Sequence, residues 1–248
     1  MSNASKLMMA AAGQGGAATD ENTVLLIRSD TTDGSTTFED LSSYGHTILQ
    51  PRGTVDHQTE QFKMGASSFL MDSSSDGLVV SASSAFNFGT GDFTIECWLR
   101  PTATASNDWM FELYNFAGNF AAGQNISVLY ENSTRAKANI ANRYNTHVFI
   151  FTNWLTVNTW SHVALVRYGN YVNLYHNGVA ASNIYNATGV DFFSSGDPYI
   201  VIGNRTNTTL EWPYNNVLPG YYDEFKVSNI ARYTGNFTPS SNYLKGET

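Results

Sequence analysis

The chain has 248 residues, of which 14% are aromatic and 14% are charged, and 13 Lys and Arg against 21 Asp and Glu give a formal charge of −8. The basic residues are scattered without a run, which argues against a nucleic-acid backbone as a partner. Cys97 is the only cysteine, so an intrachain disulfide and a cysteine-rich zinc site are excluded. This composition predicts one large all-β domain, because sandwiches reach such lengths without splitting.

Residues 1–22 are small, rich in Gly and Ala, and contain a short apolar run from Leu7 to Ala12. A signal peptide would need a longer apolar run and more basic residues before it. The second alternative is a flexible terminus without a function of its own, which is common. The third alternative is an attachment arm that becomes ordered when Leu7, Met8 and Met9 contact a partner. Such starts resemble those of tail and capsid-associated proteins of bacteriophages, which favours the arm, followed by one domain over residues 23–248.

Strand patterns then follow in chain order, separated by polar turns. Residues 23–29 form the first expected strand, and Asp30 to Gly34 a turn. Further strands are expected at 65–71, 78–81 and 93–99, the last ending before Pro101. Residues 103–159 alternate strands with Asn-, Ser- and Ala-rich loops, and no stretch of transmembrane length or useful helical period occurs.

The stretch from Trp160 to Gly178 reads WSHVALVRYGNYVNLYHNG and contains two hairpin signals. Residues 160–167 carry apolar side chains on both alternating faces, which is typical of a strand inside a sandwich. Gly169-Asn170 and Asn177-Gly178 are two-residue turns, so a three-strand meander is predicted. Closing strands are expected at 199–202, 210–212 and 221–227, after which residues 233–239 fold back over the sheet edge.

The Trp-x-His-Val-Ala-Leu-Val strand with its Leu-Tyr-x-Asn-Gly turn resembles the laminin G-like branch of the concanavalin A-like jelly rolls. Four other stretches occur in the order of that family: GASSFLMD (65–72), GDFTIECWLRP (91–101), YIVIGN (199–204) and YYDEFKVSNIARYTGNFT (221–238). The resemblance covers roughly residues 23–243. It implies an all-β, two-sheet antiparallel jelly-roll sandwich, whereas function must be argued from the site.

The motifs of common enzymes are missing from the sequence. It contains no Gly-x-Ser-x-Gly, His-Glu-x-x-His or Gly-x-x-x-x-Gly-Lys motif. The glucanases that share this fold carry paired carboxylates as Glu-x-Asp-x-x-Glu, because hydrolysis needs an acid and a nucleophile on the same sugar. Glu96 and Glu112 have no such partner, and His162 is expected to be a hydrogen-bonded core imidazole. A non-catalytic domain is therefore predicted.

Two kinds of ligand remain open. The resemblance implies that Asp223 occupies the position of a structural calcium ligand, with Asp30 as a conceivable partner, although turn aspartates usually cap backbone amides. For glycans, rings in Asn-rich surroundings are the candidates, since sugars stack on aromatic faces and amides bind hydroxyls. These candidates are Trp109, Trp154, Trp212 and Tyr214, although Trp and Tyr also dominate sandwich cores.

The sequence thus favours a virion structural or appendage protein that displays a jelly roll and holds host-surface polysaccharide. Its expected partners are other virion proteins, bound through the arm, and other copies of itself. A secreted bacterial carbohydrate-binding adhesin is the alternative, and a glycan hydrolase or lyase of the same fold is a third. Calcium is the one cofactor considered, and none is required.

Overall fold

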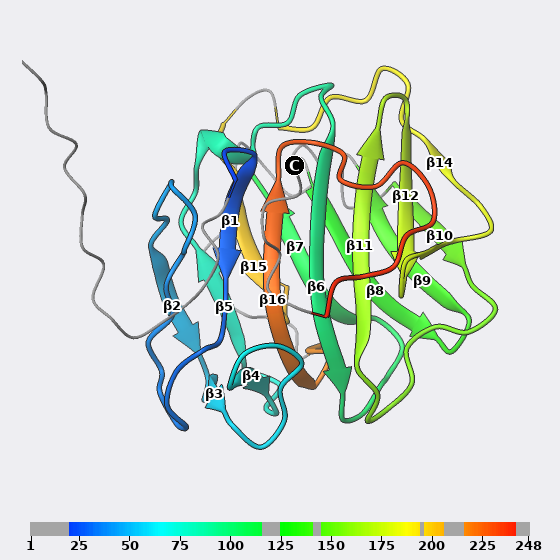
Figure 1. The fold of residues 1–248 in the computed structure, drawn as a ribbon. Helices are drawn as coiled ribbons and strands as arrows, with labels where there is room; N and C mark the ends of the chain where they lie inside the picture. The colour runs from blue at the N-terminus through cyan, green and yellow to red at the C-terminus, as the bar shows by residue number, and fades with distance from the viewer. Residues whose placement is uncertain (1–19, 116–124, 141–144, 194–195, 206–215, 242–248) are drawn as a thin grey trace, which may run out of the picture.

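The computed structural model describes residues 20–115, 125–140, 145–193, 196–205 and 216–241, which form two stacked antiparallel sheets (Figure 1). The nine-stranded sheet contains β1 (Thr23–Ile27), β3 (Asp56–Gln58), β4 (Ser68–Met71), β6 (Phe93–Pro101), β11 (Ser161–Tyr168), β12 (Tyr171–His176), β13 (Val179–Ala180), β14 (Tyr185–Asn186) and β16 (Gly220–Ser228). The seven-stranded sheet contains β2 (Ile48–Arg52), β5 (Gly77–Val80), β7 (Asp108–Tyr114), β8 (Asn125–Asn132), β9 (Arg135–Ile140), β10 (Thr146–Ile150) and β15 (Tyr199–Ile202). A single 3-10 turn, η1 (Ser84–Phe86), interrupts the strands of the described chain. This arrangement confirms the predicted two-sheet sandwich.

The core lies between the two sheets. Strands β6, β11 and β16 contribute alternate side chains to it, among them Val163, Leu165 and Phe225, all fully buried. Phe225 meets Phe111 of the opposite sheet edge to face, with ring centroids 5.9 Å apart. Cys97 also faces this core, and burial raises the pKa of its thiol far above the ordinary value. The cysteine is therefore an inert packing residue.

The strand β11 is buried on both faces, as its sequence predicts, but two different layers cover it. Val163 and Leu165 face the second sheet, whereas Ala164 and Val166 face the opposite way. Residues 229–241 cross this outer face and bury Ala164 and Val166 beneath Tyr233 and other side chains (Figure 1). We call residues 229–241 the C-terminal strap. Residues 233–239 fold back as expected, but they lie over the outer face of the sheet and not over its edge.

Most predicted strands occur, with small differences in their bounds. The first strand ends at Ile27 rather than at residue 29, and β6 extends through Pro101. Strands β2 and β3 were not predicted, because the segment that forms them is short and polar with no sustained alternation. The predicted strand at 210–212 lies outside the described residues. No helix in the described part of the chain has the length and apolar character needed to cross a membrane.

Two glycine turns in the meander have different surroundings. Asn177 and Gly178 both have positive φ, 49° and 76°, as a type I′ hairpin requires. A Cβ at Gly178 would lie 1.8 Å from the carbonyl oxygen of Phe237 in the strap. At Gly169, where φ is 57°, a Cβ would meet nothing within 4 Å. Gly178 is therefore needed for close approach of the strap as well as for the turn.

Gly178→Ala should release the strap, whereas Gly169→Ala should not. Both changes place an alanine at positive φ, which costs about 1 kcal/mol, but only the first collides with Phe237. The amide of Phe237 donates to the Gly178 carbonyl over 2.9 Å, so its hydrogen exchange reports docking. Protection of this amide should fall in Gly178→Ala and persist in Gly169→Ala. Equal protection in the two variants would contradict the close-approach argument.

Candidate functional site

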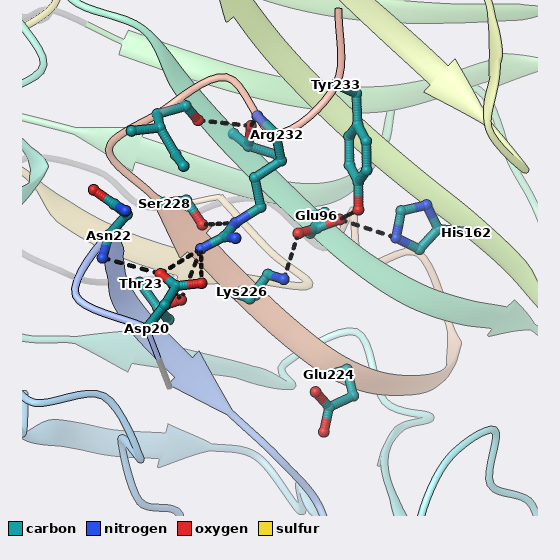
Figure 2. A network of polar contacts seen from close by, with 12 residues as sticks. Asp20, Asn22, Thr23, Glu96, His162, Glu224, Lys226, Ser228, Arg232 and Tyr233 are labelled. Carbon is teal, nitrogen blue, oxygen red and sulfur yellow. Dashed lines mark hydrogen bonds and ion pairs between the residues drawn. The ribbon is translucent and has the colours of Figure 1, made fainter. Parts of the chain in front are cut away.

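A buried polar network lies on the outer face of the nine-stranded sheet, beneath the strap (Figure 2). Its centre is Glu96 on β6, which is 2% exposed and directly opposite Lys226 of β16. Lys226 Nζ lies 2.9 Å from Glu96 Oε1, and His162 Nε2 lies 3.2 Å from Glu96 Oε2. Because β6 is flanked by β11 and β16, sheet pairing alone brings these three side chains together.

The strap completes the network and is itself fixed by it. The Tyr233 hydroxyl donates to Glu96 Oε2 over 2.8 Å. The neighbouring Arg232 Nη2 lies 2.8 Å from both carboxylate oxygens of Asp20, just before β1, and Arg232 Nε donates to Ser228 (Figure 2). The strap is thus pinned to residues far apart in the sequence. This arrangement gives the network a clear structural role.

Glu96 is held as a carboxylate. Burial alone would raise its pKa, but the charge of Lys226 and the hydrogen bond from His162 outweigh burial and hold the pKa of Glu96 well below its ordinary value. An ionised carboxylate only accepts hydrogen bonds, so His162 Nε2 carries the proton that it donates. The expectation of a hydrogen-bonded core imidazole at His162 is therefore confirmed. A lowered pKa favours the ionised form of Glu96, which accepts hydrogen bonds and does not donate a proton.

A small pocket of about 20 Å³, roughly enough for one water molecule, adjoins the network, and two carboxylates line it, Glu96 and Glu224. Trp98, His162 and Tyr233 contribute to the same walls. Glu224 sits at a bulge in β16 with φ of 50°, and its carboxylate accepts hydrogen bonds from Arg28 Nε and Nη2. Each carboxylate thus has a cationic partner. The pocket is thus lined by two carboxylates that are each paired with a cation of the same domain.

The tryptophans predicted to stack on sugars are placed differently from the expectation. Trp109 is 4% exposed and Trp154 is 1% exposed, and the Trp154 ring stacks on Phe151 at 4.6 Å. Neither ring presents a face to solvent, so the prediction of surface stacking is corrected for these two, which pack instead. Trp212 and Tyr214 lie outside the described residues, as do the arm residues Leu7, Met8 and Met9. Their roles stay predictions.

The two expected calcium ligands, Asp223 and Asp30, both lie against the loop of residues 63–66, where their carboxylates accept hydrogen bonds from backbone amides. Asp223 Oδ2 accepts the amides of Lys63 and Met64 at 3.0 and 2.9 Å, and Asp30 Oδ1 accepts that of Ala66 at 2.9 Å. Burial also raises the pKa of Asp223 to about 8, which favours the protonated carboxyl. Calcium needs six to eight oxygens, and the described residues contain no cluster of three or more His, Cys, Asp or Glu side chains suited to a metal. The donors present do not fit the ion.

A second polar patch lies on the outer face of the seven-stranded sheet. Alternation places Ile126 and Val128 in the core and therefore turns Asn125 and Ser127 the other way. Asn125 Nδ2 donates to Glu112 Oε1 over 2.6 Å, and Asn139 Nδ2 donates to Ser127 Oγ over 3.0 Å. All four side chains are buried. Glu112 is therefore a structural acceptor.

Sequence reasoning missed an exposed aromatic pair, Tyr168 and Tyr171, which are 56% and 50% exposed. They flank the Gly169-Asn170 turn that joins β11 to β12. The sequence does predict that the two tyrosines are paired, because residues on either side of a two-residue hairpin turn must lie opposite each other. It gives no measure of their exposure, since tyrosines at such positions also pack inward.

Comparisons with known proteins agree with this fold. Residues 72–234 match the family Laminin_G_3, described as the concanavalin A-like lectin/glucanases superfamily. No curated protein matches the sequence closely enough to count as a relative. Among solved structures, the binding domain of Paraclostridial Mosquitocidal Protein 1 aligns over 86% of this chain and 50% of that one, with a TM-score of 0.59 and 18% identity.

Two further structures were solved in complex with sugars. Domain 4 of AbnA, an extracellular arabinanase from Geobacillus stearothermophilus, in complex with arabinotriose, aligns over 85% of this chain and 93% of that one, with a TM-score of 0.59 and 16% identity. The ligand-binding domain of botulinum neurotoxin serotype D in complex with N-acetylneuraminic acid aligns over 86% and 48%, with a TM-score of 0.57 and 14% identity. The chain spans about half the length of these toxin structures.

At such identities the structural likeness shows the fold alone, and it is a fold that glycan-binding receptor domains also use. The family match extends over more than half of the chain and includes β6, β11, β12 and β16. The two-sheet sandwich is the architecture that this match implies. The chain therefore belongs to the concanavalin A-like lectin/glucanases superfamily, in its laminin G-like branch.

Proposed function

We propose that this chain is a non-catalytic glycan-binding protein, displayed on the surface of a virion or a cell. The observation that carries the proposal is the likeness over 93% of the arabinanase domain, a unit of nearly the same extent that was solved with arabinotriose. The N-acetylneuraminic acid complex of the neurotoxin domain gives independent support. A sandwich whose core is complete without any ligand suits such a role, since binding residues can vary on a fixed scaffold.

A non-catalytic role also agrees with how the buried carboxylates are used. Glu96 is paired with Lys226 and Glu224 with Arg28, so both charges are already satisfied within the domain. The rival function is a glycan hydrolase or lyase, which we consider because these two carboxylates line one pocket. Hydrolysis would need one of them to donate a proton, and the low pKa of Glu96 opposes this.

Attachment is proposed to occur through residues 1–22, with Leu7, Met8 and Met9 as the apolar contacts to other virion proteins. Arg232 binds Asp20, so the described end of this arm is fixed against the sandwich. A single short arm would bind weakly, so several copies in a homo-oligomer would act together. The bacterial adhesin remains the alternative, and it shares the glycan-binding role while differing in location.

The full-length protein should bind members of an immobilised panel of neutral and sialylated polysaccharides without releasing reducing ends from them. A variant lacking residues 2–19 keeps Asp20, so it should retain both glycan binding and melting temperature while failing to join its assembly. If the protein binds no glycan in the panel, the proposed function is refuted. Reproducible release of reducing ends that Glu96→Gln abolishes would favour the hydrolase instead.

A further inference from the structure

We infer that Tyr168 and Tyr171 form a binding platform for neutral hexopyranose chains, an inference that rests on the proposed function. Tyr168 ends β11 and Tyr171 begins β12, and the two residues lie directly opposite in the strand register. Directly opposite residues share one face of a sheet, with Cβ atoms about 4.5 to 5.5 Å apart. Both rings are at least half exposed. We call this pair the tyrosine platform.

The platform lies on the outer face of the nine-stranded sheet, beyond the part that the strap covers. Ala164, Val166 and Tyr168 alternate outward along β11, and the strap packs on the first two. Figure 1 shows the turn between β11 and β12 past the orange-red strap, at one end of the sheet. The two tyrosines thus face solvent, whereas the side chains on the opposite face of β11 and β12 pack in the core.

The turn between the two tyrosines is anchored on both sides of Gly169. Asp92 Oδ1 accepts the Gly169 amide over 2.7 Å. Arg167, which is 1% exposed, donates from Nε to the Gly169 carbonyl over 3.1 Å and from Nη1 to the carbonyls of Gly89 and Val190 at 3.0 Å each. A buried guanidinium with several carbonyl acceptors fixes the backbone on which the rings stand. Such preorganisation reduces the entropy lost on binding.

The chemistry around the pair suits a neutral sugar. A single exposed tyrosine is ordinary, but here two rings lie among amide side chains: Asn170 in the turn, Asn173 two positions along β12, and Asn186 opposite Tyr171 on β14. Rings stack on the apolar C–H faces of a pyranose and amides bind its hydroxyl groups. The Arg167 guanidinium faces inward and Asp92 adds negative charge, so an anionic sugar is disfavoured.

The test uses titration calorimetry of the full-length protein with cellohexaose, maltohexaose and mannohexaose as neutral probes and sialyllactose as the anionic one. At least one neutral probe should bind. Tyr168→Ala and Tyr171→Ala should each weaken its binding about tenfold, and Tyr→Phe at either position should retain most of it because the ring face remains. Tyr44→Ala is the matched control, since Tyr44 is 48% exposed in a different part of the chain. All variants should melt like the parent.

The outcomes separate this inference from the proposed function. If a neutral probe binds and the double Tyr168→Ala/Tyr171→Ala variant binds it as tightly as the parent, the platform is wrong and glycan binding stands. If only sialyllactose binds, the neutral ligand class is wrong. If neither these probes nor the wider polysaccharide panel bind the parent protein, both the platform and the proposed function fail.

Discussion

Val163→Asp should abolish folding of the domain. Val163 lies in the middle of β11, is 0% exposed and contacts the core between the two sheets. Aspartate there would bury a carboxyl without a partner, at a cost of at least about 3 kcal/mol added to the lost apolar packing. Domains of this kind are stable by only about 5–15 kcal/mol. Circular dichroism and thermal melting of the purified variant provide the measurement.

Val179→Asp is the matched control for this prediction. Val179 begins β13 at the edge of the same sheet and is 57% exposed. The same change of side chain there should alter stability by less than about 0.5 kcal/mol, because the new carboxylate stays in water. A soluble Val163→Asp protein that melts like the Val179→Asp protein would show that β11 does not occupy the interior.

Lys226→Met should destabilise the domain by about 3–5 kcal/mol, because it leaves the Glu96 charge buried and uncompensated. The double variant Glu96→Gln/Lys226→Met removes both charges and should recover a large part of the loss. Lys137→Met is the comparison at the surface. Lys137 Nζ lies 3.3 Å from Glu131 Oε1, but the lysine side chain is 26% exposed, so loss of this ion pair should cost less than about 1 kcal/mol. Urea unfolding of the four proteins measures these differences.

The Glu96 pair also predicts how the stability of the protein depends on pH. The pKa of Glu96 is depressed in the folded state, so its stabilisation is complete above the ordinary value of 4.5 and is lost as the pH falls below it. In Lys226→Met the depression disappears, and protonation would relieve the buried charge. The stability gap between parent and variant should therefore narrow from pH 7 to pH 3. A constant gap over this interval would contradict the assignment.

Local sequence patterns predict much of the fold because their physical causes are local. Asn177-Gly178 has the backbone angles that a tight hairpin demands, and β11 is apolar on both faces because two layers cover it. The apolar pattern of β11 does not reveal that one of the two covering layers is the strap. A strand face buried by a loop and one buried by a second sheet carry the same kinds of residue. The short strands β2 and β3 lack such a local pattern. They become strands because β5 and β4, which lie beside them, offer backbone hydrogen bonds.

The site depends on contacts that no local pattern contains. Tyr233 reaches Glu96 across 137 positions, and Glu96 meets Lys226 only through the register of β6 with β16. Composition likewise could not separate packed from exposed rings. Trp154 is buried whereas Tyr168 is half exposed, although both lie close to asparagines. Exposure is a property of the assembled sheets, and for this reason two of the four aromatic candidates, Trp109 and Trp154, are packed instead of exposed.

The place of β16 in the sheet has a consequence for biosynthesis. This last strand pairs with β6 on one side and with β4 and β1 on the other, and Arg28 meets Glu224 across 196 positions. Ribosomes add about 5–20 residues per second, so β1, β4 and β6 emerge many seconds before their partner. During that time they carry unpaired edges that can template aggregation. The nine-stranded sheet can therefore close only after β16 has left the ribosome, late in the synthesis of this domain.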